Sequence, residues 1–127
     1  MKTYTFKKQL DNRGCYAEII FDVQIVNPLS NNIKIKYLAD PKWEEICKAG
    51  ILIFYDYFVR KMSGDMEVCI HEIRWLPIDT NNIIILFATV EALKEALGLQ
   101  IDGFLFETKN ESFIFPEVRS NSLLSHV

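Results

Sequence analysis

The stretch DTNNIIILFATVEALKEALG, from Asp79 to Gly98, decides the fold of this 127-residue chain, because it can be read in two ways. Its β-branched start, Ile83 to Phe87, is typical of a strand that ends at a Thr89 cap. Its apolar residues also recur at helical intervals of three and four, along the stripe Ile83, Leu86, Val90, Leu93 and Leu97. Gly98 is a natural C-terminal stop for such a helix. The residues alone leave the first half open between strand and helix.

A first helix is predicted upstream, from Asp40 to about Met62. Asp40 can cap the free amides of the first turn, and Pro41 suits the first helical position. Apolar residues then recur on one face at helical spacing: Trp43, Ile46, Cys47, Gly50, Phe54, Tyr57 and Phe58. Gly50 costs the helix about 1 kcal/mol relative to Ala, and we expect a close approach of the helix to the sheet to compensate.

Period-two alternation predicts strands on both sides of this helix. These segments are Thr3–Leu10, Tyr16–Val26, Ile33–Tyr37 and Met66 to about Trp75, with a terminal hairpin over 103–106 and 112–115. The order β-β-β-α-β-α, then a hairpin, predicts a two-layer α+β domain with two helices on one face of the sheet. We expect a single domain, residues 1–118, and a flexible C-terminal tail, residues 119–127.

Composition excludes several classes of protein. With 50% hydrophobic and 24% charged residues, the chain is neither disordered nor collagen-like. The longest purely apolar run, Ile83–Ala88, is far too short to cross a bilayer, and residues 1–8 contain no secretory signal. Cys15, Cys47 and Cys69 form no C-x-x-C pair, which is typical of reduced thiols. We therefore expect a cytoplasmic protein without a membrane partner.

The charge is distributed unevenly. The formal net charge of −3 argues against an overall nucleic-acid-binding surface. Residues 1–38 nevertheless carry a net charge of +3, and the remainder carries −6. A basic end could contact phosphate locally, although ordinary solvated strand faces explain the pattern equally well.

The sequence contains little catalytic apparatus. No phosphate-binding loop and no dinucleotide-binding turn is present, so we expect no cofactor and no enzymatic activity. Cys69 and His71 share a strand face, and a Cys/His hydrolase is the alternative. A nucleophile also needs an orienting group and an oxyanion site, and the sequence singles out neither. Glu67 with Cys69 and His71 is a poor metal site, because neighbours on one strand rarely close a tetrahedral shell.

Three motifs, in order, resemble domain IV of translation elongation factor G and of ribosomal protection proteins. The run from Phe6 to Gln9, with 13–17 (RGCYA), is similar to the opening of that domain. Pro41-Lys42 with Ala49-Gly50-Ile51 resembles its first helix. The stretch from Pro77 to Thr80, followed by Ala88 and then 92–96 (ALKEA), resembles its second helix and needs no gap. The matches extend from about Thr3 to Gly98.

The resemblance implies a fold and a setting. It places the second helix at about Asn81–Leu97, and it implies the fold of the second domain of ribosomal protein S5. That fold has a mostly antiparallel four-stranded sheet and a left-handed β-α-β crossover, an exception to the usual right-handed connection. In the family, two tip loops of domain IV enter the decoding region of the small ribosomal subunit, where they contact tRNA and mRNA.

The tip residues follow from the same resemblance. The first loop is Asp11-Asn12-Arg13-Gly14, in which Arg13 and Gly14 match the family and the other two residues replace Gly-Gly. The second loop falls at 72–76, where Leu76 stands in the place of the family's tip histidine. The candidate binding residues are therefore Lys7, Lys8, Asp11, Asn12, Arg13, Gly14, Arg74, Trp75 and Leu76.

Two binding functions compete. The first is a non-enzymatic, stand-alone module that contacts the ribosome or a translation partner, with Lys7, Lys8 and Arg13 holding phosphates and Trp75 packing on a base or a protein surface. The second is a protein-interaction module that kept the fold and lost RNA binding, and that dimerises through the edge of its terminal hairpin. A GTPase domain is absent from the sequence, so ordinary translocation is excluded.

Overall fold

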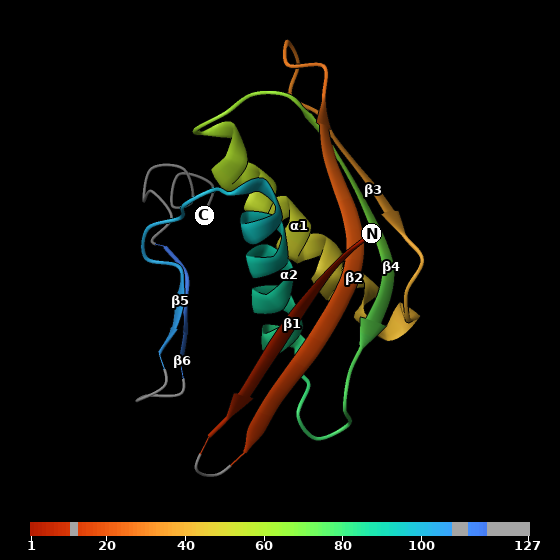
Figure 1. Ribbon diagram of the computed structural model, residues 1–127, viewed down its shortest axis with the longest axis vertical. Coiled ribbons are helices and arrows are strands. Elements are labelled where there is room, and N and C mark those ends of the chain that lie inside the picture. The colour runs from red at the N-terminus through yellow and green to blue at the C-terminus, as the bar shows by residue number, and fades with distance from the viewer. Residues whose placement is uncertain (11–12, 108–111, 117–127) are drawn as a thin grey trace, which may run out of the picture.

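Four strands form one mixed sheet in the computed structural model, which describes residues 1–10, 13–107 and 112–116. They are β1 (Lys2–Gln9), β2 (Gly14–Val26), β3 (Ile33–Tyr37) and β4 (Asp65–Arg74). Their spatial order is β1-β2-β4-β3, as Figure 1 shows. The β1–β2 and β2–β4 pairs are antiparallel and the β3–β4 pair is parallel. The predicted α+β class and mostly antiparallel sheet are confirmed.

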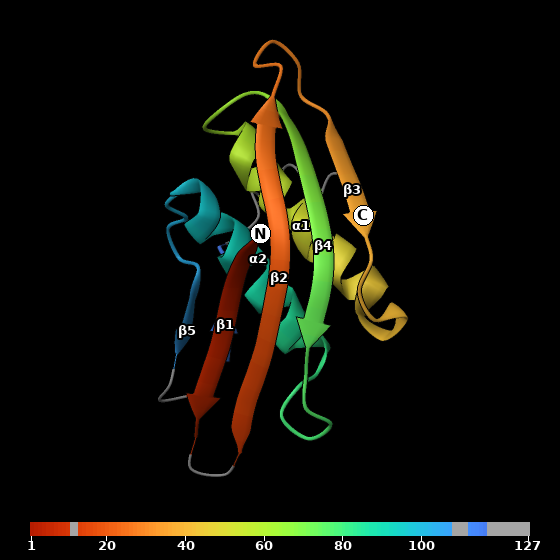
Figure 2. The same ribbon diagram turned by 45° about the vertical axis from the view of Figure 1, so that its right-hand side comes forward.

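Two helices cover one face of this sheet and leave the other face open (Figure 2). Helix α1 (Glu44–Val59) follows a 3₁₀ turn (η1, Pro41–Trp43), and helix α2 (Asn82–Leu97) follows β4. The ambiguous stretch is therefore helical. The Asn81 side chain caps α2 by accepting a hydrogen bond from the Ile84 amide at 3.0 Å, and Gly98, at φ 64°, ends the helix.

The buried face of α2 differs from the predicted stripe at its start. Ile83, the first residue of that stripe, is 40% exposed, whereas Ile84 and Ile85 are buried. The helix contacts the sheet on one side and α1 on another, and Phe87 stacks on Phe104 with ring centroids 4.4 Å apart. Because α2 has partners on several sides, no single helical stripe describes its burial.

Gly50 lies against α2 and not against the sheet, so our expectation for this residue was wrong. A Cβ on Gly50 would come within 3.0 Å of the Thr89 Cβ and 3.2 Å of the Leu86 carbonyl oxygen. The missing side chain thus lets the two helices pack closely, which is what offsets the intrinsic cost of glycine in a helix.

The connection from β3 through α1 to β4 has the uncommon hand. With the helices behind the sheet, as in Figure 2, β3 lies to the right of β4 and both strands run downward. A chain that passes behind the sheet and returns one strand to the left makes a left-handed crossover, against the strong right-handed preference of such units.

A β-bulge interrupts β4 where it pairs with β2. Ile20 pairs with Glu72 and Phe21 pairs with Ile70, so His71 is the additional residue. The bulge shifts the alternation by one position, and Ile70 and Ile73 both point into the core. His71 keeps its side chain on the open face, next to Cys69.

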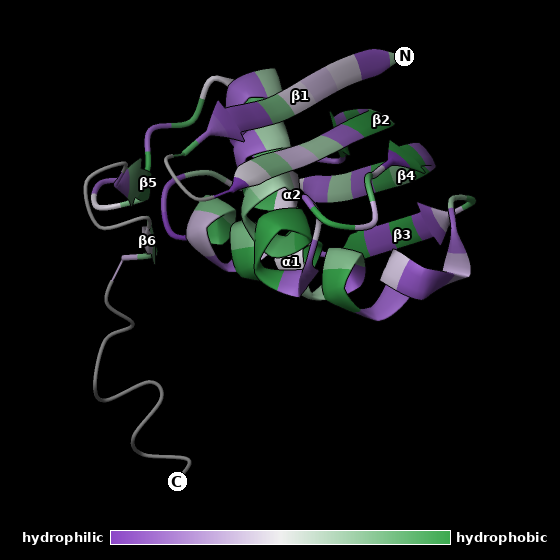
Figure 3. Ribbon diagram, turned by 90° about the horizontal axis from the view of Figure 1, so that it is seen from below, coloured by the Kyte–Doolittle hydropathy of each residue, from purple (hydrophilic) through white to green (hydrophobic). Residues whose placement is uncertain are grey.

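The predicted terminal hairpin is present as β5 (Leu105–Glu107) paired with β6 (Ser112–Ile114). Phe106 and Phe113 pack against Phe6, with centroid distances of 5.6 and 5.7 Å. Viewed from below the sheet, Figure 3 shows this hairpin beside the helices at the β1 side of the domain. The predicted tail, residues 119–127, lies outside the described residues.

Candidate functional site

Two loops meet at one end of the sheet. The β1–β2 hairpin and the loop from β4 to α2 lie side by side at the bottom of Figure 1. The Tyr16 amide donates to the Asp79 carbonyl at 2.9 Å, and the Thr80 hydroxyl donates to the Tyr16 carbonyl at 2.5 Å. A Cβ on Gly14 would lie 2.8 Å from Asp79 Oδ2, so glycine permits this close approach. We call the end formed by residues 7–10, 13–14 and 75–81 the tip.

Cationic side chains project from the tip in different directions. Lys7, Lys8 and Arg13 are exposed. Lys7 lies opposite Tyr16 on the open face, whereas Lys8 lies on the helix-covered face, because successive residues of a strand point to opposite sides. The Leu10 amide donates to the Arg13 carbonyl at 2.7 Å and closes the hairpin. Asp11 and Asn12 lie outside the described residues.

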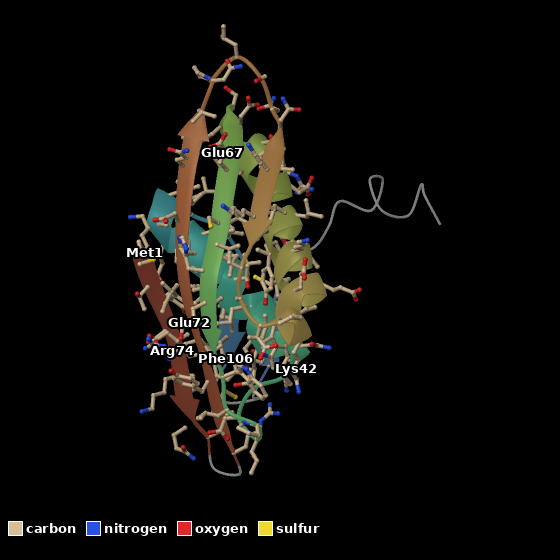
Figure 4. The ribbon with its side chains drawn as sticks, turned by 90° about the vertical axis from the view of Figure 1, so that its right-hand side faces the viewer. Met1, Lys42, Glu67, Glu72, Arg74 and Phe106 are labelled. Carbon is tan, nitrogen blue, oxygen red and sulfur yellow. The ribbon has the colours of Figure 1, made fainter. Side chains whose placement is uncertain are left out.

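Arg74 is engaged by two carboxylates. Its guanidinium lies 3.0 Å from Glu18 Oε1 and 2.8 Å from Glu72 Oε2, and Figure 4 shows Arg74 and Glu72 close together on the open face. The hydrogen bond and the charge of Glu72 raise the pKa of Arg74 above its usual value. Arg74, whose side chain is 57% exposed, is therefore paired with carboxylates of its own sheet face.

The side chain of Trp75 turns away from the other tip residues and toward the start of α1. Its indole N–H donates to Asp40 Oδ2 at 3.1 Å, and its ring meets Trp43 edge-on with centroids 5.4 Å apart. The Lys42 ammonium lies 4.7 Å from the centre of the Trp75 ring. Trp75 therefore anchors the β4–α2 loop to the start of α1. The apolar groups that the loop does present are Leu76, 46% exposed, and Ile78, 92% exposed.

A second cluster lies in the middle of the open face. Cys69 Sγ is 3.9 Å from His71 Nδ1, and His71 Nε2 is 2.6 Å from Asp22 Oδ2. Cys69 and Asp22 are register partners on adjacent strands. The order thiol, imidazole, carboxylate is that of an activated nucleophile with an oriented base. The hydrogen bond from His71 lowers the pKa of the Asp22 carboxyl.

The sequence identified Cys69 and His71 but missed Asp22. Alternation along β2 does place Asp22 on the polar face, and that was the available signal. Which strand would lie beside β4, and in what register, depends on the whole sheet. The orienting group therefore became visible only in the assembled fold.

A groove of about 500 Å³ adjoins the cluster. Its walls come from β2, β3 and β4 and comprise Asp22, Val23, Gln24, Lys34, Lys36, Glu67, Val68 and Cys69. Gln24 donates to Glu67 Oε1 at 2.7 Å, so this carboxylate is occupied. Over residues 1–10, 13–107 and 112–116, no group of three His, Cys, Asp or Glu side chains could hold a metal ion.

Comparison with known proteins shows a solved structure that shares the fold of this chain. No family model matches the chain, and no curated protein matches it in sequence. A crystal structure of a protein from Thermus thermophilus shares the fold, with a TM-score of 0.59 at 14% sequence identity. The match covers 74% of this chain and 15% of that one, so the chain spans only a small part of that protein's length. At this identity the likeness concerns the fold alone.

The helices of the described segments fall short of what a membrane span requires. None of these helices combines the length and the apolar character that a bilayer requires.

Proposed function

We propose that this chain is a non-enzymatic binding module that contacts RNA of the small ribosomal subunit through its tip, as a cytoplasmic protein resembling domain IV of elongation factor G. The observation that carries the proposal is the pairing of the two tip loops. The Tyr16 amide donates to the Asp79 carbonyl and the Thr80 hydroxyl donates to the Tyr16 carbonyl, and these two hydrogen bonds hold the loops together as one surface. Preorganised loops lose little conformational entropy when they bind a rigid partner.

The fold supports the proposal independently of the tip. The left-handed crossover is rare among β-α-β units, and the resemblance in the sequence to domain IV implies it. The occurrence of the same fold within a much longer Thermus thermophilus protein is consistent with a module related to a domain of a larger factor.

The charges at the tip define the binding residues. Lys7, Lys8 and Arg13 are exposed and form no ion pair among the described residues, so their charges are available to phosphate oxygens. Arg74 and Trp75, which have partners inside the molecule, take no part in the proposed contact. Two or three phosphate contacts imply a modest affinity that falls steeply as salt rises.

Salt-dependent co-sedimentation with purified 30S subunits tests the proposal. We expect the wild-type chain to pellet with subunits at low salt, and Arg13→Glu and Lys7→Glu each to weaken binding by about tenfold. Lys34→Glu is the matched control, because it reverses one exposed charge on β3, away from the tip. Equal binding by wild type and Arg13→Glu, or no binding by either, would rule out this function.

A protein partner is the second candidate, and the exposed Leu76 and Ile78 favour it. Exposed apolar side chains on one loop suit a protein surface better than an RNA surface. Under this alternative, Ile78→Ser abolishes capture of a partner while Arg13→Glu has no effect. Light scattering of the purified chain tests the related prediction of a dimer formed through the β5–β6 hairpin.

A further inference from the structure

We propose that Cys69 on the open sheet face is the reacting thiol of a thiol–disulfide exchange site, whose substrates are small disulfides that carry carboxylates. The site is separate from the tip, and it uses the one cluster on this face that combines a thiol, an imidazole and a carboxylate within the described residues. The inference does not depend on the ribosomal function.

Proton transfer at the site follows from the hydrogen bonds. His71 Nε2 lies 2.6 Å from Asp22 Oδ2, which fixes the ring proton on Nε2. The lone pair of Nδ1 then faces Cys69 Sγ, 3.9 Å away and within the longer reach of a sulfur donor. Asp22 acts as a positioning residue for the base. Alternation along β4 puts the ring on the same face as the thiol, and the bulge leaves His71 as the extra residue of the strand, a feature that is common next to reactive sites.

Two lysines in the groove favour an anionic partner. Lys36 is the register partner of Cys69 on β3, and Lys34 lines the same groove. Neither lysine forms an ion pair within the described segments of the chain. Of the groove's two carboxylates, Asp22 contacts His71 and the N-terminal amine, and Glu67 keeps its charge while it accepts a hydrogen bond from the neutral Gln24. Lys34 and Lys36 are thus cations of the groove without a paired carboxylate among the described residues, and they can attract the carboxylates of a small disulfide.

Accessibility distinguishes Cys69 from the other two cysteines. Cys69 is half-buried and lines the groove, whereas Cys15 and Cys47 are 1% and 0% exposed. Burial raises the pKa of the Cys47 thiol to about 11, so that thiol stays protonated and unreactive near neutral pH. A disulfide in solution therefore meets a single reactive sulfur.

The surroundings suit exchange better than hydrolysis. Acyl transfer needs two or more donors aimed at a developing oxyanion. β4 is an inner strand, paired with β2 on one side and with β3 on the other, so its amides are used in the sheet. Disulfide exchange requires no oxyanion hole, because the charge that develops leaves on a thiolate.

The reaction balances without any further reagent. Cys69 gives its proton to His71 Nδ1, and the thiolate attacks one sulfur of the small disulfide. A bond forms between Cys69 Sγ and that sulfur while the disulfide bond of the reagent breaks. The released thiolate takes the proton back from His71, which leaves one mixed disulfide and one small thiol.

Stopped-flow kinetics with two reagents test the proposal: dithiobis(nitrobenzoate), which carries two carboxylates, and dithiodipyridine, which carries no charge. We expect one fast thiol per native chain, absent in Cys69→Ser. His71→Gln and Asp22→Asn should each slow the reaction about tenfold near pH 6.5, and should approach the wild-type rate near pH 9.5, where an ordinary thiol is ionised. A loss caused only by altered packing would be the same at both pH values.

Substitution of the two groove lysines tests which class of disulfide the site prefers. The double substitution Lys34→Gln/Lys36→Gln should slow the anionic reagent at least about threefold and leave the uncharged one unchanged. Lys8→Gln, on the opposite face of the sheet, is the matched control and should affect neither. Incubation with glutathione disulfide, followed by mass spectrometry, should place one adduct on Cys69.

The proposal fails if the wild-type thiol reacts no faster than the same thiol in the urea-unfolded chain. It also fails if His71→Gln and Asp22→Asn, both with native circular dichroism, match the wild-type rate across the pH range. If the lysine variants slow both reagents equally, the site does not select carboxylate-bearing disulfides.

Discussion

Gly50 of α1 faces Thr89 of α2 so closely that a Cβ on the glycine would lie 3.0 Å from the Cβ of the threonine. Thr89 is 1% exposed, and its hydroxyl donates to the Ile85 carbonyl at 2.7 Å. Neither residue has room to move without shifting a helix, because protein interiors are close-packed. The contact therefore sets the distance between the two helices.

Gly50→Ala tests this contact. Alanine should gain about 1 kcal/mol of helix propensity, but overpacking should cost about 1–3 kcal/mol. We expect a net loss in the free energy of unfolding of up to about 2 kcal/mol, measured by urea denaturation. Gly50→Ala combined with Thr89→Ser, which removes the Thr89 Cγ2 methyl that would lie 3.2 Å from the new Cβ, should recover part of the loss. A more stable Gly50→Ala variant would show that the helices separate freely.

Thr80 connects the two tip loops, and its side chain should contribute more to the free energy of unfolding than that of an exposed threonine. Its hydroxyl donates to the Tyr16 carbonyl at 2.5 Å and accepts from the Leu76 amide at 3.0 Å. Thr80→Val leaves both groups without this partner in a buried position and should cost about 1–3 kcal/mol. Thr3→Val, at an exposed position on β1, is the control and should change stability by less than about 0.5 kcal/mol. Equal effects of the two substitutions in urea denaturation would contradict the bridging role of Thr80.

Trp75 should contribute to stability and not to ribosome binding. Trp75→Phe removes the hydrogen bond to Asp40 and weakens the cation–π contact with Lys42, so we expect a loss of about 1–2 kcal/mol. The variant should pellet with 30S subunits as well as the wild type does, provided that both are folded at the assay temperature. Unchanged stability together with lost binding would place the Trp75 ring in the contact surface.

Asp65 makes the stability of the fold depend on pH. Its carboxylate accepts from the Ser30 hydroxyl at 2.7 Å and from the Asn32 amide at 2.8 Å, and these hydrogen bonds lower its pKa. An acid with a lowered pKa in the folded state stabilises the protein above the unfolded pKa, which is about 3.9 for Asp. This contribution is lost as pH falls through the folded value.

Asp65→Asn should therefore be less stable than the wild type at neutral pH, with a difference that is constant down to about pH 5 and shrinks below about pH 4. Urea denaturation at a series of pH values measures this difference. Asp102→Asn, at an exposed loop position, is the matched control and should show no such trend. A pH-independent difference for Asp65→Asn would mean that the carboxylate charge has no role.

Local patterns in the sequence were sufficient to predict most of the strands and helices. Alternation predicted the four strands and the hairpin, and Asn81 and Gly98 are a cap and a stop that act within one helical turn. Where two periodicities coincided, at Ile83–Phe87, the residues alone could not decide. The segment is a helix because its apolar residues can then contact the sheet and α1 together.

The candidate sites depended on relationships that no local pattern contains. Cys69 and His71 share a face by alternation, but Asp22 reaches His71 because β2 pairs with β4 in a register that sets Asp22 opposite Cys69. The inward turn of Trp75 likewise depends on Asp40 and Trp43, which are more than thirty residues away.

The sequence by itself thus determined the strands, the first helix and the second half of α2, since these follow from the spacing of neighbouring residues and from caps. Only the tertiary structure decided the partner of Gly50, the hydrogen bonds that unite the two tip loops, and the triad of Cys69, His71 and Asp22. The physical reason is that strand order and register come from packing the whole chain at once, and a single bulge displaces every later side chain by one position.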